Sequence, residues 1–350
     1  MNTNNVELNP SKLLRYRDSV YATDLLICSI AYFDFFTFLK DRSWTFDDIC
    51  EYLNISPRPA EVMLSLFLAM ELILKTGTGY KLTAVSREYL VSDSPASLIP
   101  YYASLNNRPQ TKEFREILIT GKPSGWSSKD DGKAWKEAMR DVQFANSFTA
   151  AMDSRGSFLA QMLVQRLSQP LVRSPDMSRY KSLLDIAGGS GVYACSISQR
   201  YEHMGATVLE ISPVDEAARR SIESKDMSQR VDVVAGDMFN KIPRGYDVHL
   251  FANVLHDWDM DSVKKLAANS FESLNADGLI IVFDAHLNED KDGPLSVAEY
   301  SCLLMHSTEG RCYSTKEIGD ILEGVGFTDI IVTEVAAERT MITGNKKTER

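Results

Sequence analysis

The segment LLDIAGGSG at residues 183–191 of this 350-residue chain leads from an apolar run through a carboxylate into three glycines. Glycine lets the backbone turn tightly and approach a ligand, and a helix that begins directly after the turn presents its N-terminus to negative charge. A carboxylate just before the turn repels a pyrophosphate and favours a ligand that carries an ammonium or sulfonium group. We expect the segment to bind a cofactor through Asp185, Gly188, Gly189 and Gly191.

Two later segments have the residue types and the spacing of a nucleoside site. Glu210 lies 21 residues beyond Gly189, at the end of the next apolar run, where an acidic side chain accepts hydrogen bonds from ribose hydroxyls. Gly236-Asp237-Met238-Phe239 follows the third apolar run. There, the Asp237 carboxylate is suited to an adenine amine, and Met238 to the face of the ring. We expect Glu210, Asp237, Met238 and Phe239 to contact the cofactor.

The segment NVLHDWD at residues 253–259 places His256 directly after a fourth apolar run. An imidazole with a pKa of about 6.5 can remove a proton from a phenol or an enol, and such general-base catalysis typically contributes roughly 10²–10⁴ in rate. His203 and His249 lie in a predicted helix end and a predicted strand, and we assign them no role. His256 is the candidate catalytic base, because ligands of a parallel sheet bind at the carboxyl ends of its strands.

These motifs lie in a region where short apolar runs alternate with amphipathic stretches. Six strands are predicted, at residues 182–187, 207–211, 231–235, 248–252, 279–284 and 330–335. Helices are predicted between them, including 262–274 and 315–325. The alternation indicates a doubly wound, mostly parallel, Rossmann-like α/β domain over residues 176–350.

Residues 1–95 are predicted to form a small α-helical domain with the element order of a winged helix. Thr45 and Asp48 form a capping box for a helix at 46–52, Pro57 opens a second helix that continues to residue 74, and two glycines at 77 and 79 mark a hairpin. Only five basic residues oppose seven acidic ones between residues 41 and 92. Such a surface offers little to phosphates, so the region is interpreted as a dimerisation module and not as a DNA-binding one.

Residues 96–175 connect these two regions. Proline, glycine and serine residues between positions 109 and 132 indicate an exposed loop, and a helix is predicted from residue 135 to about residue 167. Its apolar residues Phe144, Phe148 and Met152 have the spacing of a helical core face. The alternative hypothesis is that the segment is a lid whose same side chains contact a small-molecule substrate.

Composition argues against several classes of protein. The chain has 38 basic and 48 acidic residues, a formal net charge of −10, and therefore no general affinity for nucleic acid. Its most apolar early stretch, residues 24–39, is too short for the roughly 20 residues that cross a bilayer. The first ten residues lack the basic and apolar regions of a secretion signal. Five widely spaced cysteines without a CxxC pair favour a reducing, cytoplasmic location.

LLDIAGGSG, GDMF, NVLHDWD and the later segment EGRCYS (residues 309–314) together resemble the S-adenosylmethionine-dependent small-molecule O-methyltransferases over nearly the whole chain. The resemblance implies S-adenosylmethionine as cofactor and a homodimeric, cytoplasmic enzyme of secondary metabolism. It also implies that His256 is the general base and that Asp284 orients it. Cys312 stands where plant-type members carry a glutamate, which departs from the usual pair of orienting acids.

The spacing of His256 and His306, 50 residues apart, resembles a subgroup of this family that methylates the β-carbon of 2-oxo acids. In that subgroup two histidines hold a metal ion, here a divalent or ferric ion, which lowers the pKa of the enol. Arg108 or Arg311 would bind the carboxylate of such an acceptor. The expected acceptor pocket contains six side chains, namely Phe144, Phe148, Met152, Met305, His306 and Arg108.

Three other classes of function remain as alternatives. Residues 189–194, GSGVYA, satisfy the GxGxxA form of the dinucleotide fingerprint, which would suit an NAD-dependent oxidoreductase. The winged-helix order would suit a transcription regulator. The third alternative is a member of the resembled O-methyltransferase family that binds the cofactor but does not transfer a methyl group, because a fold alone does not guarantee catalytic activity.

Overall fold

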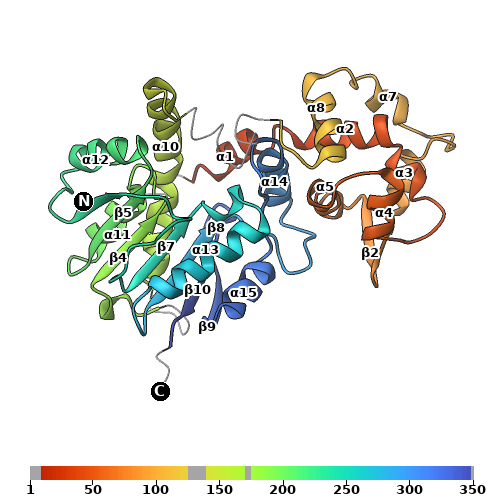
Figure 1. Cartoon of the computed structure of the whole chain (residues 1–350). Coiled ribbons are helices and arrows are strands. Elements are labelled where there is room, and N and C mark those ends of the chain that lie inside the picture. The colour runs from red at the N-terminus through yellow and green to blue at the C-terminus, as the bar shows by residue number, and fades with distance from the viewer. Residues whose placement is uncertain (1–8, 125–138, 170–174, 348–350) are drawn as a thin grey trace, which may run out of the picture. The chain divides into compact units, whose positions relative to one another are not determined.

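The computed structural model describes residues 9–124, 139–169 and 175–347. The chain forms two compact units, one of Met1–Asp131 with Leu287–Ser314 and one of Gly132–His286 with Thr315–Arg350 (Figure 1). Residues 287–314 therefore pack with the N-terminal part of the chain, an association that the predicted boundaries after residues 95 and 175 do not anticipate.

The second unit is built on a seven-stranded sheet with the order β6-β5-β4-β7-β8-β10-β9. Its strands are β4 (Ser182–Ile186), β5 (Gly205–Glu210), β6 (Val231–Ala235), β7 (Val248–Ala252), β8 (Leu279–Asp284), β9 (Thr328–Glu334) and β10 (Thr340–Asn345). The first five of these run parallel, and β10 pairs antiparallel with both β8 and β9. The predicted doubly wound, mostly parallel α/β fold is confirmed.

Agreement between predicted and observed strands is best at the centre of the sheet. β6, β7 and β8 have the predicted bounds, and β4, β5 and β9 differ from prediction by one or two residues at their ends. The sequence pattern does not predict β10. Its sequence, TMITGN, contains glycine and asparagine, which are depleted in strands, and only pairing with β8 and β9 makes it extended.

Helices of the second unit cover the sheet (Figure 1). They are α10 (Val142–Leu167), α11 (Val192–Arg200), α12 (Val214–Ser224), α13 (Met260–Ser273) and α15 (Thr315–Gly324), with short 3-10 turns η2 (Met177–Arg179) and η3 (Leu255–Asp257). α11 and α12 pack on β5 and β6, and α10 packs on α11 and α12. The fully buried side chains of Leu183, Val208 and Leu250 lie in the hydrophobic core of this unit.

The first unit is mainly helical. Its helices are α1 (Ser11–Asp18), α2 (Ala22–Phe33), α3 (Phe35–Phe38), α4 (Phe46–Leu53), α5 (Pro57–Ala69), α6 (Ala84–Tyr89), α7 (Ile99–Ala103), α8 (Pro109–Thr120) and α14 (Leu295–Ser307). Its strands β1 (Trp44–Thr45), β2 (Ile73–Thr76) and β3 (Gly79–Leu82) form a small sheet of order β1-β3-β2. The sequence α4, α5, β2, β3 is the predicted winged-helix order, and the capping box of Thr45 and Asp48 is present.

The prediction that the second helix of the winged-helix motif continues to residue 74 is wrong. α5 ends at Ala69, and Glu71 adopts a left-handed backbone conformation with φ of 58°, which no helix continues through. Residues Ile73–Thr76 then form β2. An apolar run does not by itself distinguish a helix from a strand, and here the turn at Glu71 decides between them.

Arg58, at the start of α5, binds the C-terminal end of α14. Its Nη1 donates to the carbonyls of Thr308 (3.1 Å) and Gly310 (2.8 Å), and its Nη2 donates to those of Gly121 (3.0 Å) and Met305 (3.4 Å). Burial lowers the pKa of Arg58 to about 10, so the guanidinium remains charged at neutral pH. Three of the four backbone acceptors of this charged side chain lie in the returning segment 287–314, and Arg58 thus anchors that segment.

Within the described ranges, none of the helices has both the length and the apolar composition needed to cross a bilayer. The five cysteines are free thiols, namely Cys28, Cys50, Cys195, Cys302 and Cys312.

Candidate active site

The glycine-rich segment forms a tight turn between β4 and α11. Gly189 and Gly191 have φ angles of 57° and 75°, in the left-handed region that glycine adopts without strain. A Cβ atom on Gly188 would lie 2.6 Å from the Asp185 carboxyl carbon, so only glycine fits there. α11 begins at Val192, directly after the turn. The predicted strand, turn and helix are all present.

Asp185 is fully buried beneath this turn. Its Oδ2 accepts a hydrogen bond from the Ala194 amide at 3.2 Å, and its Oδ1 has no hydrogen-bond partner among the described residues. Burial raises the pKa of Asp185 to about 7. A buried carboxylate oxygen without a donor can accept a cation or a hydrogen bond from a ligand, which fits the predicted ammonium-bearing or sulfonium-bearing cofactor.

Glu210, at the end of β5, holds the same turn from the neighbouring strand. Its Oε1 accepts from the Gly189 amide at 3.0 Å and its Oε2 from the Ile211 amide at 2.9 Å. Burial raises the pKa of Glu210 to about 7. The two carboxylates that the sequence indicates, Asp185 and Glu210, therefore lie at the adjacent ends of paired parallel strands.

The third cofactor segment follows β6. Asp237 Oδ1 accepts a hydrogen bond from the Phe239 amide at 2.9 Å, and Met238 is 7 % exposed. The Phe239 ring meets the Trp258 ring edge to face, with 4.6 Å between centroids. This contact joins the predicted adenine segment to the His256-Asp257-Trp258 segment, an association that sequence spacing does not reveal.

His256 and Asp284 form a buried pair at the ends of β7 and β8. The two strands are paired in parallel, with Ala252 opposite Phe283, so the residues that follow them come together. His256 Nδ1 lies 2.5 Å from Asp284 Oδ1, and both side chains are almost completely buried. Asp284 Oδ1 also accepts the Ala285 amide at 2.7 Å. The carboxylate therefore fixes one ring nitrogen and leaves Nε2 for other partners.

In this pair, each side chain stabilises the charged form of the other. Burial by itself lowers the pKa of His256, but the carboxylates of Asp284 and Asp257 outweigh burial and the pKa is raised. For Asp284, burial raises the pKa, and the interaction with His256 more than offsets it, so the pKa is lowered. The pair thus favours an ionised carboxylate beside an imidazole whose proton affinity is higher than usual.

Asp257 is a functional candidate that the sequence motifs do not assign. Its Oδ1 lies 3.5 Å from His256 Nε2, the nitrogen that Asp284 does not use. Its side chain is 45 % exposed, in contrast to the buried Asp284. The one signal in the sequence is its position next to His256 in NVLHDWD.

Two other histidines of the second unit, His249 and His286, have structural partners. His249 Nδ1 lies 2.9 Å from Ser270 Oγ, and burial lowers the pKa of His249 to about 3. His286 Nδ1 lies 2.6 Å from Thr340 Oγ1, and burial lowers the pKa of His286 to about 4. Both rings are therefore neutral at pH 7.

The predicted acceptor side chains of α10 differ in how far they are described. Phe144 is partly buried and packs with Val214 and Met139, and Met152 is partly buried as well. The side chain of Phe148 lies outside the described residues. These positions place the N-terminal half of α10 in the same unit as the glycine turn.

Met305, His306 and Arg108, predicted for the acceptor pocket, lie in the first unit and already have partners there. Met305 is fully buried. His306 Nε2 lies 2.6 Å from Glu113 Oε2, and its ring stacks on Tyr21 with 4.4 Å between centroids. Arg108 donates from Nε and Nη2 to the two carboxylate oxygens of Asp24, at 2.6 and 3.1 Å.

Cys312 and Arg311, both candidates from the sequence, are also buried in the first unit. The Cys312 amide donates to Ser301 Oγ at 3.1 Å. Arg311 Nη2 lies 2.8 Å from Glu61 Oε2. The Arg311 guanidinium therefore already carries one carboxylate partner.

The predicted metal ligands His256 and His306 belong to different units, and each has a carboxylate partner in its own unit. Among the described residues, no cluster of three or more His, Cys, Asp or Glu side chains is arranged to hold a metal ion.

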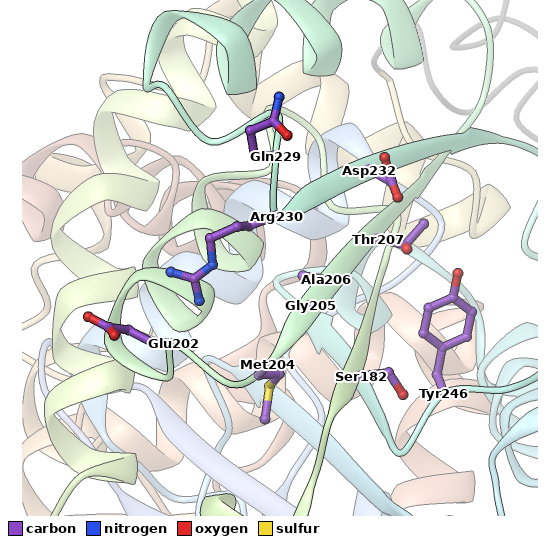
Figure 2. Close-up of a pocket in the computed structure, with 10 residues that line it drawn as sticks. All are labelled: Ser182, Glu202, Met204, Gly205, Ala206, Thr207, Gln229, Arg230, Asp232 and Tyr246. Carbon is purple, nitrogen blue, oxygen red and sulfur yellow. The ribbon is translucent and has the colours of Figure 1, made fainter.

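A separate open hollow of about 390 Å³ lies at the amino ends of β4 and β5 (Figure 2). Its lining includes Ser182, Glu202, Gly205, Arg230 and Asp232. Parallel strands place their carboxyl ends at the opposite edge of the sheet, so this hollow is remote from the glycine turn and from His256. Arg230, its cationic side chain, donates to the carbonyls of Ser198 and Tyr201.

Known proteins with similar sequences and structures agree on one family. The sequence profile of the O-methyltransferase domain matches residues 114–328. A 3-hydroxy-5-methyl-1-naphthoate 3-O-methyltransferase from Streptomyces sahachiroi is 27 % identical over 293 residues, which cover 83 % of this chain and 81 % of that protein. An L-tyrosine C(3)-methyltransferase from Streptomyces lavendulae is 31 % identical over 163 residues, covering 46 % of this chain and 44 % of that protein.

A solved structure of similar fold is that of an O-methyltransferase family 2 protein from Planctomyces limnophilus in complex with apigenin. It superimposes with a TM-score of 0.86 at 26 % identity and covers 97 % of both chains. These matches exclude the oxidoreductase alternative raised by the GxGxxA pattern, because the profile covers the whole glycine turn and the His256 segment. The chain belongs to the O-methyltransferase family and is an S-adenosylmethionine-dependent methyltransferase.

Proposed function

We propose that this protein methylates a hydroxyl group of a small aromatic metabolite, with His256 as the general base and Asp284 as the residue that orients it. The observation that carries the proposal is the 2.5 Å contact between His256 Nδ1 and Asp284 Oδ1. It holds the ring with Nε2 directed away from the carboxylate. The names of two similar proteins, a naphthoate 3-O-methyltransferase and a protein bound to apigenin, support an aromatic hydroxyl acceptor.

The cofactor would be held at the carboxyl ends of β4, β5 and β6. Asp185 offers a buried carboxylate oxygen to a cationic group, and Glu210 offers carboxylate oxygens to ribose hydroxyls. The remaining contacts would come from Gly188, Gly189, Gly191, Asp237, Met238 and Phe239. When bound, S-adenosylmethionine supplies an electrophilic methyl group.

His256 would supply the proton transfer that makes the acceptor nucleophilic. Its Nε2 would take the hydroxyl proton, and the Asp284 carboxylate would stabilise the resulting imidazolium. The electron pair of the O–H bond would stay on the acceptor oxygen and form the bond to the methyl carbon, while the pair of the broken carbon–sulfur bond would leave with sulfur. Asp257, 3.5 Å from Nε2, adds a second negative charge beside the imidazolium. The side chains of Phe144, Phe148 and Met152 would align the acceptor ring, because an in-line displacement requires accurate positioning.

A second candidate is methylation at carbon. It is favoured by the match to an L-tyrosine C(3)-methyltransferase, which is 31 % identical over 163 residues. A phenolate or an enolate carries negative charge on carbon as well as on oxygen, so the same base suits both reactions. A 2-oxo acid acceptor would additionally require a metal ion held by His256 and His306, and a carboxylate site at Arg108 or Arg311.

We also propose a cytoplasmic homodimer that serves secondary metabolism. The first unit exposes large apolar side chains on and just after α1 and around α7, namely Leu13, Tyr16, Val20, Leu98, Tyr101 and Leu105. Exposed apolar groups of this size are typical of interaction surfaces. The five free thiols fit a reducing compartment.

The test is to incubate the protein with S-adenosylmethionine and a mixed panel of naphthols, flavones, tyrosine and 2-oxo acids, with and without a chelator. Mass spectrometry would detect the methyl gain, and fragmentation would assign it to oxygen or carbon. An oxygen-linked gain that resists the chelator supports the first proposal. A chelator-sensitive gain on a 2-oxo acid would replace it. Cofactor binding with no methylated product from the panel would support the non-methylating alternative.

A further inference from the structure

A side-chain hydrogen bond joins α10 to the glycine turn. Ser190, between Gly189 and Gly191, donates from its hydroxyl to Asp153 Oδ1 at 2.5 Å. Lys225, just after α12, donates to the same oxygen at 3.4 Å. Ser190 is only 5 % exposed, so water has little access to its hydroxyl and could hardly take the place of Asp153 as hydrogen-bond acceptor. A hydrogen bond to an ionised carboxylate is about twice as strong as one between neutral groups.

Asp153 lies at the boundary between a partly buried half of α10 and a half that packs in the hydrophobic core. From Gly156 onward the helix belongs to the core, with Leu159 and Leu163 fully buried. A Cβ on Gly156 would lie 2.8 Å from Val192 Cγ1, so the helix approaches the start of α11 at close range there. Before Asp153 the helix carries the partly buried Phe144 and Met152. The contact with Ser190 therefore occurs at the junction of the anchored half and the half proposed to face the acceptor.

We infer that Asp153 and Ser190 are positioning residues that couple the cofactor turn to the acceptor-binding half of α10. The inference rests on the proposed function for the cofactor turn and for α10. Glu210 accepts a hydrogen bond from the Gly189 amide, and Asp153 accepts one from the hydroxyl of the next residue, Ser190. A cofactor that orders the turn thereby orders the carboxylate of Asp153 and the turn of helix that bears Met152. Neither residue is among the proposed contacts to the reacting atoms.

Hydrogen exchange measured by mass spectrometry tests the coupling, with S-adenosylhomocysteine as the probe. In the wild-type protein the probe should slow exchange both in the turn at residues 186–191 and in α10 at residues 142–155. In Ser190→Ala, and separately in Asp153→Asn, protection of the turn should persist while protection of α10 is largely lost. Ser190→Thr keeps the hydroxyl and should therefore retain the protection of α10. Ser196→Ala removes a hydroxyl from α11 that bonds the Val192 carbonyl of its own helix, and it should behave as wild type.

Calorimetric titration with the same probe adds a second readout. Ser190→Ala should weaken binding about three- to tenfold, and the Asp153→Asn/Ser190→Ala double variant should weaken it no further, because residues that act as a pair are non-additive. Unchanged α10 protection in both single variants, or additive losses in the double variant, would overturn the inference. Failure of the wild-type protein to bind the probe would instead overturn the proposed cofactor site on which the inference depends.

Discussion

His256 Nδ1 lies 2.5 Å from Asp284 Oδ1, although the two residues are 28 positions apart in the chain. The contact exists because β7 and β8 are adjacent parallel strands, so that the residues following each strand meet at one edge of the sheet. It gives the imidazole a fixed orientation and an ionised neighbour. Most of the expected behaviour of the enzyme follows from this pair and from the two carboxylates at the glycine turn.

Replacing His256 by alanine removes the proposed base and should lower kcat by roughly 10²–10⁴ on an acceptor found by the panel. Affinity for S-adenosylhomocysteine, measured by calorimetry, should stay within about threefold of wild type, because the base is not one of the proposed cofactor contacts. His203→Gln is the matched control, since His203 is exposed and contacts the Met177 carbonyl, away from the proposed site. A His256→Ala enzyme with full activity would exclude the mechanism.

The pH profile should report the raised pKa of His256. The base works only when neutral, so kcat/KM should rise with pH and level off above a pKa higher than the ordinary value of 6.5. Asp284→Asn removes the larger of the two carboxylate effects while burial remains, so the acidic limb should move to lower pH and the maximal rate should fall about 10²-fold. An acidic limb that stays in place in this variant would show that Asp284 does not set the proton affinity of His256.

Asp185 should destabilise the ligand-free protein at neutral and alkaline pH. Its pKa is about 7 in the fold against an ordinary value of 3.8, so the unfavourable ionised form develops as pH rises from about 4 through about 7. Asp185→Asn should therefore raise the free energy of unfolding by about 1–2 kcal/mol at pH 8 and by little at pH 4. The same variant should weaken S-adenosylhomocysteine binding more than about tenfold.

Exposed Asp232 on β6 is the matched control, and Asp232→Asn should change neither stability nor binding. Denaturant unfolding at the two pH values gives the comparison. A stability gain for Asp185→Asn that is equal at both pH values would contradict the argument from ionisation.

Arg58 should be a large contributor to the stability of the first unit. Arg58→Met keeps much of the buried stem but leaves the carbonyls of Thr308, Gly310 and Gly121 without their donor. The free energy of unfolding should fall by about 2–4 kcal/mol. Arg87→Met, at an exposed arginine of the same unit, should change it by less than about 0.5 kcal/mol. Equal effects of the two substitutions would show that the buried guanidinium is dispensable.

The proposed dimer should depend on the exposed apolar side chains of α1. Leu13 and Tyr16 are 70 % and 73 % exposed in the single chain. The double substitution Leu13→Asp/Tyr16→Asp should shift the mass measured by light scattering from twice the 39.2 kDa chain toward a single chain. Val332→Asp, at an exposed apolar residue of β9, should leave the mass unchanged. A wild-type protein that elutes as a monomer would refute the homodimer.

The amino-acid sequence by itself determined the fold class and the positions along the chain of the proposed site residues. Apolar runs of strand length, glycines at 188, 189 and 191, and polar residues directly after each run are local features, and they suffice to place Asp185, Glu210, Asp237 and His256 at or just after strand ends. The parallel sheet then brings these ends to one edge. Such features are predictable because burial alternation and backbone freedom act within a few residues.

Only the tertiary structure decided which side chains meet. The packing of α14 with α5, the extended conformation of TMITGN in β10, and the contact of Asp153 with Ser190 join segments far apart in the chain. The partners of Arg108 and His306, namely Asp24 and Glu113, come from other helices for the same reason. Each of these contacts depends on how separate elements pack against each other. The local sequence around one residue does not specify which distant residue it will contact.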